Sequence, residues 1–187
     1  MDYRRLEREV FVELNAARTN PSAYAKHLSE MIPLFEGTVR RRPGSVAIRT
    51  NEGVSAVREG VNALLAQTSV PALVMNDRLS QAPRDLVTDQ TRTGNVGHTG
   101  SDGSTPGTRI SRYGTWGVSY SENVDYGHVL SGREVIVDLI VDDGVPGRGH
   151  RTNIFDPSAR VAGIACGPHS KYGIACVIDQ TGAFTPK

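Results

Sequence analysis

The sequence predicts an α+β protein in which helices flank a small central antiparallel sheet. Two observations predict this class. Several segments before residue 145 place apolar residues at helical spacing, and two β-like hydrophobic runs separated by turn residues follow near the C-terminus. The length of 187 residues fits one domain, which we expect to span residues 1–187.

The first thirty residues are predicted to form two helices. Leu6, Val10 and Leu14 recur every four residues and make one apolar stripe. Asn20 interrupts this pattern and can cap a second helix, with Pro21 at its first position. We expect the second helix to end near residue 27 or 28, since sequence patterns locate helix ends only to within about 2–4 residues.

The following stretch is predicted to contain two helices separated by irregular segments. Residues 33–49 look irregular, apart from a short strand expected at 46–48, and a helix is predicted over 51–67. The buried face of this helix should consist of Val54, Val57, Val61, Leu64 and Leu65. Asn76 is expected to cap a further helix that runs to about residue 90, and Pro83 should kink or fray its first turns.

The C-terminal half is predicted to contain a long loop, one helix and a hairpin. Seven glycines lie among residues 94–117, which we therefore expect to form a loop that leads into a strand. Ser131 opens the last helix with a capping box, and this helix should end at residues 142–144. The hydrophobic runs 161–166 and 172–178 then predict an antiparallel hairpin.

Composition argues against several classes of protein. The formal net charge is +1, which gives no reason to expect nucleic acid or an anionic membrane as a partner. No run of about 20 apolar residues is present, so no transmembrane segment is expected. The charged N-terminus has no apolar signal core, so no secretory signal peptide is expected in the sequence as written.

The two cysteines, Cys166 and Cys176, are too few for a disulfide scaffold and match no zinc-binding spacing. They lie at equal distances from Lys171, so the predicted hairpin could place them opposite each other and allow a disulfide. The missing signal sequence instead favours two buried free thiols, because disulfides are rare in reducing compartments.

Three places in the sequence carry residues that are suited to chemistry. His98 lies among glycines, where the backbone rather than side-chain packing would place it; the alternative is an ordinary surface histidine. Glu122 has apolar and aromatic neighbours that suggest partial burial, so it needs a partner; the alternative is a strand-edge glutamate paired with an arginine. Asp142 and Asp143 precede His150 at a predicted helix C-terminus, which carries partial negative charge.

A positive partner would stabilise two aspartates at that helix end. Arg148 or Arg151 could supply it, and so could an imidazole or a metal ion. Histidines and carboxylates that converge can bind a divalent metal such as zinc, or act as general acids and bases. No HExxH, GxSxG, P-loop or dinucleotide-binding motif is present, so no catalytic residue is assigned and no organic cofactor is expected.

Five segments, in order, resemble the CAP superfamily, which includes cysteine-rich secretory proteins, insect venom allergens and plant pathogenesis-related proteins. The matching segments are 14–21, 76–82, 97–106, 120–124 and 149–154. Met75 stands where tryptophan is usual in this family, and Ser121 stands where glycine is usual. The resemblance is closest to cysteine-poor members from bacteria and protists. Residues 32–70 match less of the common pattern and look like an insertion that carries an extra helix.

The resemblance implies an α/β/α sandwich whose cleft holds two histidines and two acidic residues. By motif, three of these are His98, Glu122 and His150, and the fourth is an acidic residue at the end of the preceding helix. Asp142 aligns with that position, and Asp143 is one step away. His98 and His150 would then be the candidate ligands for Zn²⁺ or another divalent metal, together with Glu122 or Asp142.

Members of this family differ in activity, so the resemblance implies three alternative functions. The first is a non-enzymatic binding or signalling module with a metal-competent cleft, whose partner would be a protein or a lipid. The second is a metal-dependent or acid–base hydrolase, similar to a protease, that uses the same cleft. The third is a sterol or fatty-acid carrier, for which four Phe and one Trp offer few aromatic residues. The resemblance implies an extracellular location, whereas the absence of a signal peptide allows an intracellular one.

Overall fold

The computed structural model describes residues 1–41, 47–128 and 131–187. Its main sheet has four strands in the order β4–β6–β7–β5, and every neighbouring pair is antiparallel except the short parallel pair β4–β6. The strands are β4 (Val74–Met75), β5 (Gly114–Gly127), β6 (Val161–His169) and β7 (Gly173–Pro186). No helix in these described ranges is long and apolar enough to cross a membrane.

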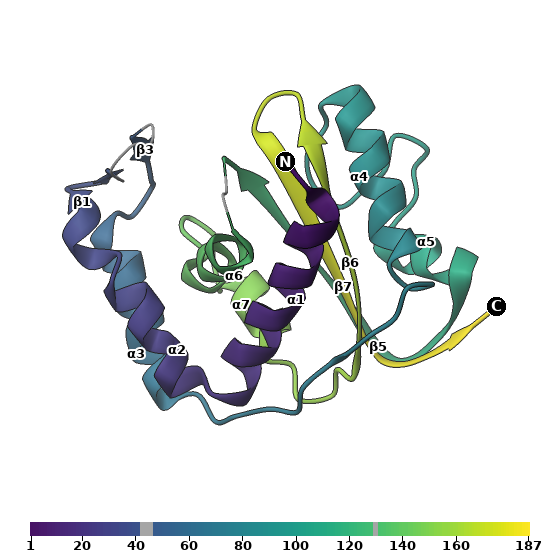
Figure 1. The fold of residues 1–187 in the computed structure, drawn as a ribbon, viewed down its shortest axis with the longest axis horizontal. Coiled ribbons are helices and arrows are strands. Elements are labelled where there is room, and N and C mark those ends of the chain that lie inside the picture. The colour runs from purple at the N-terminus through teal and green to yellow at the C-terminus, as the bar shows by residue number, and fades with distance from the viewer. Residues whose placement is uncertain (42–46, 129–130) are drawn as a thin grey trace.

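Helices cover both faces of this sheet (Figure 1). One face carries α1 (Tyr3–Thr19), α6 (Gly132–Val141) and α7 (Gly149–Ile154), and the other carries α4 (Gln81–Thr93) and α5 (Pro106–Tyr113). Further out, beside α6, lie α2 (Pro21–Ser29) and α3 (Val54–Ala66). The predicted α+β class, with helices flanking a small sheet, is therefore confirmed.

The terminal hairpin is confirmed, and its burial explains why its strands are so hydrophobic. The strands β6 and β7 pair from Val161 opposite Thr181 to His169 opposite Gly173. Because helices cover both faces, successive side chains enter two different cores. Ile164 packs in the core beside α1 and α6, whereas its neighbour Ala165 packs with α4 on the other face.

The first two helices form as predicted. The helix α1 begins after Asp2 and buries Leu6, Val10 and Leu14 on one face. Asn20 then separates α1 from α2, and its side chain accepts a hydrogen bond from the backbone N–H of Ala23 at 3.3 Å. A short polar side chain at this position satisfies a donor that the new helix leaves unpaired.

The described part of residues 32–70 contains a small sheet and one helix that packs against the main core. These residues contain a 3₁₀ turn (η1, Ile32–Leu34), three paired strands of two residues each and α3. The strands are β1 (Phe35–Glu36), β2 (Val39–Arg40) and β3 (Ile48–Arg49). The strand predicted at 46–48 begins only at Ile48, and Val46 lies outside the described residues.

The helix predicted over 51–67 is confirmed as α3, but its buried face differs at one position. Leu65, expected to be buried, is 60% exposed. Val57, Gly60 and Leu64 are buried along one face of this helix. Leu65 is one further residue round the helix, which turns its side chain toward solvent.

The prediction of a helix capped by Asn76, with Pro83 disturbing its first turns, placed the start of the helix too early. The Asn76 side chain accepts from the backbone N–H groups of Arg78 and Leu79, so it caps a turn rather than the helix itself. The helix α4 begins only at Gln81, which places Pro83 in its first turn. The first N–H groups of a helix have no intrahelical acceptor, so proline removes no helical hydrogen bond there.

The predicted loop over 94–117 is a loop only in its first half. The helix α5 occupies Pro106–Tyr113, and β5 begins at Gly114. Thr105 caps α5 by accepting from the N–H of Thr108, and Pro106 occupies its first turn. Threonine followed by proline is a helix-start signal that the density of glycines obscured.

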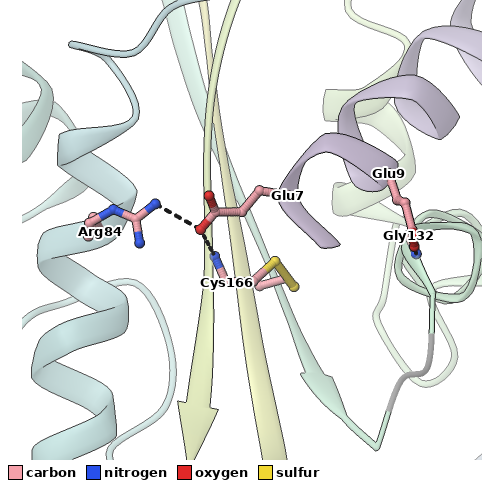
Figure 2. The surroundings of a disulfide bond; sticks show 6 residues. Glu7, Glu9, Arg84, Gly132 and Cys166 are labelled. Carbon is pink, nitrogen blue, oxygen red and sulfur yellow. Dashed lines mark hydrogen bonds and ion pairs between the residues drawn. A yellow bond between two sulfur atoms is a disulfide. The ribbon is translucent and has the colours of Figure 1, made fainter. Parts of the chain in front are cut away.

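The two cysteines form a disulfide, so the favoured prediction of free thiols was wrong. Cys166 and Cys176 lie directly opposite each other in the hairpin, with Cα atoms 4.2 Å apart. Figure 2 shows Glu7 of α1 beside this bond, where it accepts from the Cys166 backbone N–H at 3.0 Å and from Arg84 of α4 at 2.7 Å. The register of the hairpin brings the two cysteines together, and directly opposed residues on neighbouring strands are close enough to form a disulfide.

One fully buried arginine joins three distant parts of the chain. Arg18, near the end of α1, donates to the carbonyls of Pro71, Ile154, Asp156 and Ala159. Burial lowers its pKa to about 10. The guanidinium thus satisfies carbonyls that the surrounding loops would otherwise leave buried without a donor.

Candidate functional site

His98 lies on the loop after α4, and two hydrogen bonds to the backbone of the preceding Gly97 hold that loop in place. Gln90 donates to the carbonyl of Gly97 at 2.8 Å, and the Gly97 N–H donates to the Tyr126 hydroxyl at 2.8 Å. Gly97 has φ of 92°, which favours glycine directly before the histidine. The imidazole Nδ1 of His98 lies 2.8 Å from Oε1 of Glu122, and its side chain remains 48% exposed.

Glu122 lies on β5, and two partners share its carboxylate. One oxygen faces His98, and the other accepts from Nη2 of Arg109 at 2.6 Å. Both Glu122 and Arg109 have side chains only 1% exposed. Arg109 also donates to the carbonyls of Ser104 and His98, so it fixes the histidine loop as well as the carboxylate. The arginine pairing and the histidine pairing, considered as alternatives for Glu122, both occur.

A second buried carboxyl group lies beside this cluster. Asp179 of β7 is the cross-strand partner of Glu122 and is fully buried. Burial and the neighbouring Glu122 carboxylate together raise the pKa of Asp179 well above its usual range. The buried cluster therefore contains one arginine beside two carboxyl groups, and burial favours the neutral form of Asp179.

His150 lies in the first turn of α7, and Asp142 holds it from the end of α6. The Asp142 carboxylate accepts from the His150 backbone N–H at 2.9 Å and lies 2.7 Å from its Nδ1. Asp142 is itself the C-terminal cap of α6, in a left-handed conformation with φ of 53°. The same residue thus ends one helix and orients the imidazole at the start of the next.

The structure distinguishes the two candidate aspartates. Asp142 contacts His150, whereas Asp143 accepts from the backbone N–H groups of Asn51 and Glu52. The arginines proposed as partners of these carboxylates pair elsewhere. Arg148 pairs with Glu52 and Glu59, and Arg151 pairs with Glu59. The Asp142 carboxylate therefore pairs with the imidazole of His150, and the Asp143 carboxylate pairs with two backbone N–H groups.

The two histidine–carboxylate pairs lie next to each other. The ring centres of His98 and His150 are 6.4 Å apart, with planes tilted by 39°. Asn123, beside Glu122 on β5, donates to the His150 carbonyl at 3.0 Å and accepts from Asn153 of α7 at 2.8 Å. All four residues named from the sequence, His98, Glu122, Asp142 and His150, are thus brought together; we call them the tetrad.

A cavity opens beside one half of the tetrad. It has a volume of about 250 Å³ and lies between residues 32–70 and the body of the protein. His150 and Asp142 form part of its wall, but His98 and Glu122 do not. The half that contains His98 and Glu122 is instead reached from the surface, through the exposed face of His98.

The tetrad has a limited capacity to hold a metal ion. In the part of the chain that the structure describes, no group of three or more histidine, cysteine or acidic side chains is arranged as a metal site. Both oxygens of Glu122 and both of Asp142 already accept hydrogen bonds. Each carboxylate occupies an imidazole Nδ1, which leaves Nε2 as the free ligand atom of each ring. The two Nε2 atoms are therefore the donor atoms that the tetrad could still offer to an ion.

Two members of this cluster were missed by the sequence analysis. Arg109 lies 13 residues before Glu122, and Asp179 lies 57 residues after it, so no local spacing links them. Arg109 could have been found from the Thr105–Pro106 signal, which would have placed it on a helix beside the histidine loop. Asp179 carries a weaker signal, since a single aspartate within a hydrophobic strand has no local partner.

Comparison with known proteins agrees with this architecture. The sequence model of the cysteine-rich secretory protein family (CAP) matches residues 14–179. No curated protein matches the sequence. An outer surface protein from Borrelia burgdorferi is similar in structure, with a TM-score of 0.50 and 16% identity, over 63% of this chain and 80% of that one.

A second solved structure has the same degree of similarity. It is an extracellular protein containing an SCP domain from Bacillus anthracis strain Ames, with a TM-score of 0.50 and 11% identity. The match covers 75% of this chain and 48% of the Bacillus chain, so the present chain spans about half the length of that relative. At such identities the structures support the fold alone, whereas the family model covers most of the sequence. The chain belongs to the cysteine-rich secretory protein (CAP) family.

Proposed function

We propose that this protein is a non-enzymatic binding module whose tetrad binds a divalent metal ion through His98 and His150. The observation that carries the proposal is the pairing of each Nδ1 with a carboxylate. A carboxylate at Nδ1 fixes the ring orientation and the tautomer, which leaves Nε2 unprotonated and available as a ligand. The ring centres lie 6.4 Å apart, so one tetrahedral ion with zinc–nitrogen bonds of about 2.0–2.1 Å would have to draw the two rings closer together.

Two protein ligands make this a weak and open site. Zinc sites that hold their metal permanently have three or four protein ligands, so water or a ligand from a partner must complete the coordination here. An ion bound in this way would link the protein to that partner. Glu122 and Asp142 act by orienting the rings, since their oxygens are already hydrogen-bonded.

A zinc titration tests the proposal. Zinc binds the assembled site better than the unfolded chain and should raise the melting temperature of the parent protein. With zinc at 100 times its dissociation constant, the stabilisation should reach about 2.7 kcal/mol. The double variant His98→Ala/His150→Ala should stay folded and lose this shift, and EDTA should reverse it in the parent.

The matched control is His27→Ala, which removes a histidine of α2 that lies outside the tetrad. It should retain the full zinc response. An equal zinc shift in the double variant would sink the proposal, and so would a parent protein that zinc fails to stabilise at all. The second result would leave the tetrad as a hydrogen-bonded structural cluster.

One observation favours a second candidate, an acid–base hydrolase. A carboxylate that orients an imidazole is also the arrangement of a general base. Among the described residues, however, no hydroxyl or thiol forms a hydrogen bond with either imidazole, and both cysteines are in the disulfide. Turnover of ester or peptide substrates that disappears in His98→Ala would support this candidate over the binding module.

We further propose that the protein works outside the cytoplasm. Its structural relatives are described as an outer surface protein and an extracellular protein, and its disulfide is typical of oxidising compartments. Two free thiols in the protein taken from its native cells would count against this location.

A further inference from the structure

Charged side chains from residues 32–70 bind the loop that leads to His150. Both oxygens of Glu52 bond Arg148, to Nη1 and Nη2, at 2.7 Å each. Glu52 also accepts from the Gly144 backbone N–H at 2.7 Å. These bonds to Arg148 and Gly144 lower the pKa of Glu52 to about 2. A single side chain from outside the loop thus contacts it at two points.

The loop between α6 and α7 needs such support because its backbone is unfavourable. Two non-glycine residues adopt left-handed conformations, Asp142 with φ of 53° and Arg148 with φ of 52°. Gly144 and Gly147 each have φ of 77°. Left-handed conformations of ordinary residues persist only where surrounding contacts fix them. Asp142 lies at the start of this loop, and Arg148 lies at its end, directly before the helical turn that carries His150.

A continuous path of hydrogen bonds leads from Glu52 to the imidazole. Nη1 of Arg148 bonds Glu52 and also donates to the Asp142 carbonyl at 2.7 Å. The Asp142 carboxylate then accepts from the backbone N–H and Nδ1 of His150. Each step of this path is a direct contact of 2.9 Å or less. The position of the imidazole is thereby connected to a residue outside the α6–α7 region.

We propose that Glu52 is a positioning residue for His150, acting through Arg148 and Asp142. In this role residues 32–70 set the geometry of one half of the tetrad, while the other half is set by the main body of the fold. The inference concerns the site of the proposed function but does not depend on metal binding. It assigns to residues 32–70 a role in the site that no family motif carries.

Removing Glu52 should leave the protein folded. Asp143 independently bonds the backbone of Asn51 and Glu52, and Arg151 bonds Glu59 through both carboxylate oxygens. These contacts keep residues 32–70 attached when the Glu52 side chain loses its charge. Glu52→Gln therefore isolates the path to His150 from the packing of the segment.

The experiment is ¹⁵N NMR of the imidazole rings in the presence of EDTA, with resonances assigned by His98→Gln and His150→Gln. The Nδ1 and Nε2 shifts report the tautomer and the hydrogen bond of each ring. In Glu52→Gln we expect the His150 resonances to shift or broaden while those of His98 stay unchanged. Arg148→Lys should give the same result, because an ammonium cannot supply the two-pronged bond to Glu52.

Glu36→Gln is the matched control, since Glu36 forms an exposed ion pair with Arg41 at 2.8 Å within the same segment. It should leave both histidines unchanged. Unaltered His150 resonances in Glu52→Gln would overturn the proposal, and so would equal changes at His98, which would indicate general loosening.

If the parent binds zinc, Glu52→Gln should also weaken binding by about tenfold, the lower end of the range for residues that support metal ligands. If the parent does not bind zinc but Glu52→Gln still shifts only the His150 resonances, metal binding is refuted and the positioning role of Glu52 is upheld. The two proposals therefore fail separately.

Discussion

The two halves of the tetrad contain the same chemical pair, an imidazole held at Nδ1 by a carboxylate, but their supports differ. Glu122 and its partner Arg109 are each 1% exposed and lie between β5 and α5. Asp142 is also buried, yet the loop that carries it is held by Glu52, whose side chain is 38% exposed. One half is therefore supported from inside the protein, and the other is supported from its surface.

This difference predicts different responses to perturbation. A buried ion pair is screened little by salt, and breaking it leaves an uncompensated charge in the interior. Ion pairs at the surface are weaker, because water and salt compete with them. The His98 half should therefore be rigid until the domain unfolds, whereas the His150 half can be adjusted while the domain stays folded. Four experiments examine that contrast.

The largest effect should come from Arg109→Met. This change leaves the Glu122 carboxylate buried without its cation, which should destabilise the domain by about 3–5 kcal/mol. Urea unfolding measures the cost. Arg112→Met on the same helix breaks only half-exposed pairs with Asp85 and Asp102, and should cost no more than about 1 kcal/mol. Equal costs for the two variants would remove the distinction between inside and surface support.

The disulfide should stabilise both halves without favouring either. The double variant Cys166→Ala/Cys176→Ala opens a crosslink between residues ten apart, which should cost about 2–4 kcal/mol. The bond lies in the β6–β7 hairpin, three positions along β7 from Asp179. Thermal unfolding should show one earlier transition, with the imidazole spectra of His98 and His150 unchanged below it. A selective change at His98 would show that the hairpin also controls the site.

Asp179→Asn tests the interior half through its pH dependence. A carboxyl group whose pKa is raised on folding stabilises the protein below its unfolded pKa, and this contribution is lost as the pH rises through the folded value. The parent should therefore lose stability above about pH 4 relative to Asp179→Asn, which has no proton to release. Chemical unfolding from pH 4 to pH 9 measures the difference. Parallel profiles for parent and variant would show that Asp179 is ionised in the folded protein.

The smallest effect should be that of salt. Raising the ionic strength from 0.1 to 1 M shortens the screening length from about 10 to about 3 Å, which weakens exposed pairs most. Hydrogen exchange at Gly144 and Arg148 should then rise by roughly twofold, while exchange at Gly97 stays constant. A salt response at Gly97 of the same size would mean that both loops depend on surface charge.

The sequence located the residues of the tetrad because each lies in a short motif with a recognisable neighbourhood. His98 has its glycines, and His150 follows a helix end that is rich in aspartate. The motifs could not choose between Asp142 and Asp143, because the choice depends on which carboxylate the left-handed cap turns toward the imidazole. Adjacent residues can face opposite partners, and spacing along the chain does not show which.

The supporting residues were not predicted because they come from distant elements. Glu52 is 98 residues before His150, and Asp179 faces Glu122 only through the register of β5 against β7. The disulfide shows the same limit. The hairpin placed its cysteines opposite each other, but the choice between thiols and a disulfide depends on whether the compartment is oxidising, which the strand pattern does not show. Periodicity and capping signals predicted the longer helices and the hairpin, since these depend on local patterns, but the short helices α5 and α7 were not predicted.

Arg18 has a consequence for how the chain reaches this structure. Its acceptors lie 53 residues away at Pro71 and 136–141 residues away at Ile154, Asp156 and Ala159. Contacts between such distant residues require large loops to close, and loop closure costs entropy before any contact is gained. The arginine cannot lose its water until both of these segments have arrived. Its burial should therefore complete the folding reaction rather than nucleate it, with the end of α1 joined to residues 154–159 late in folding.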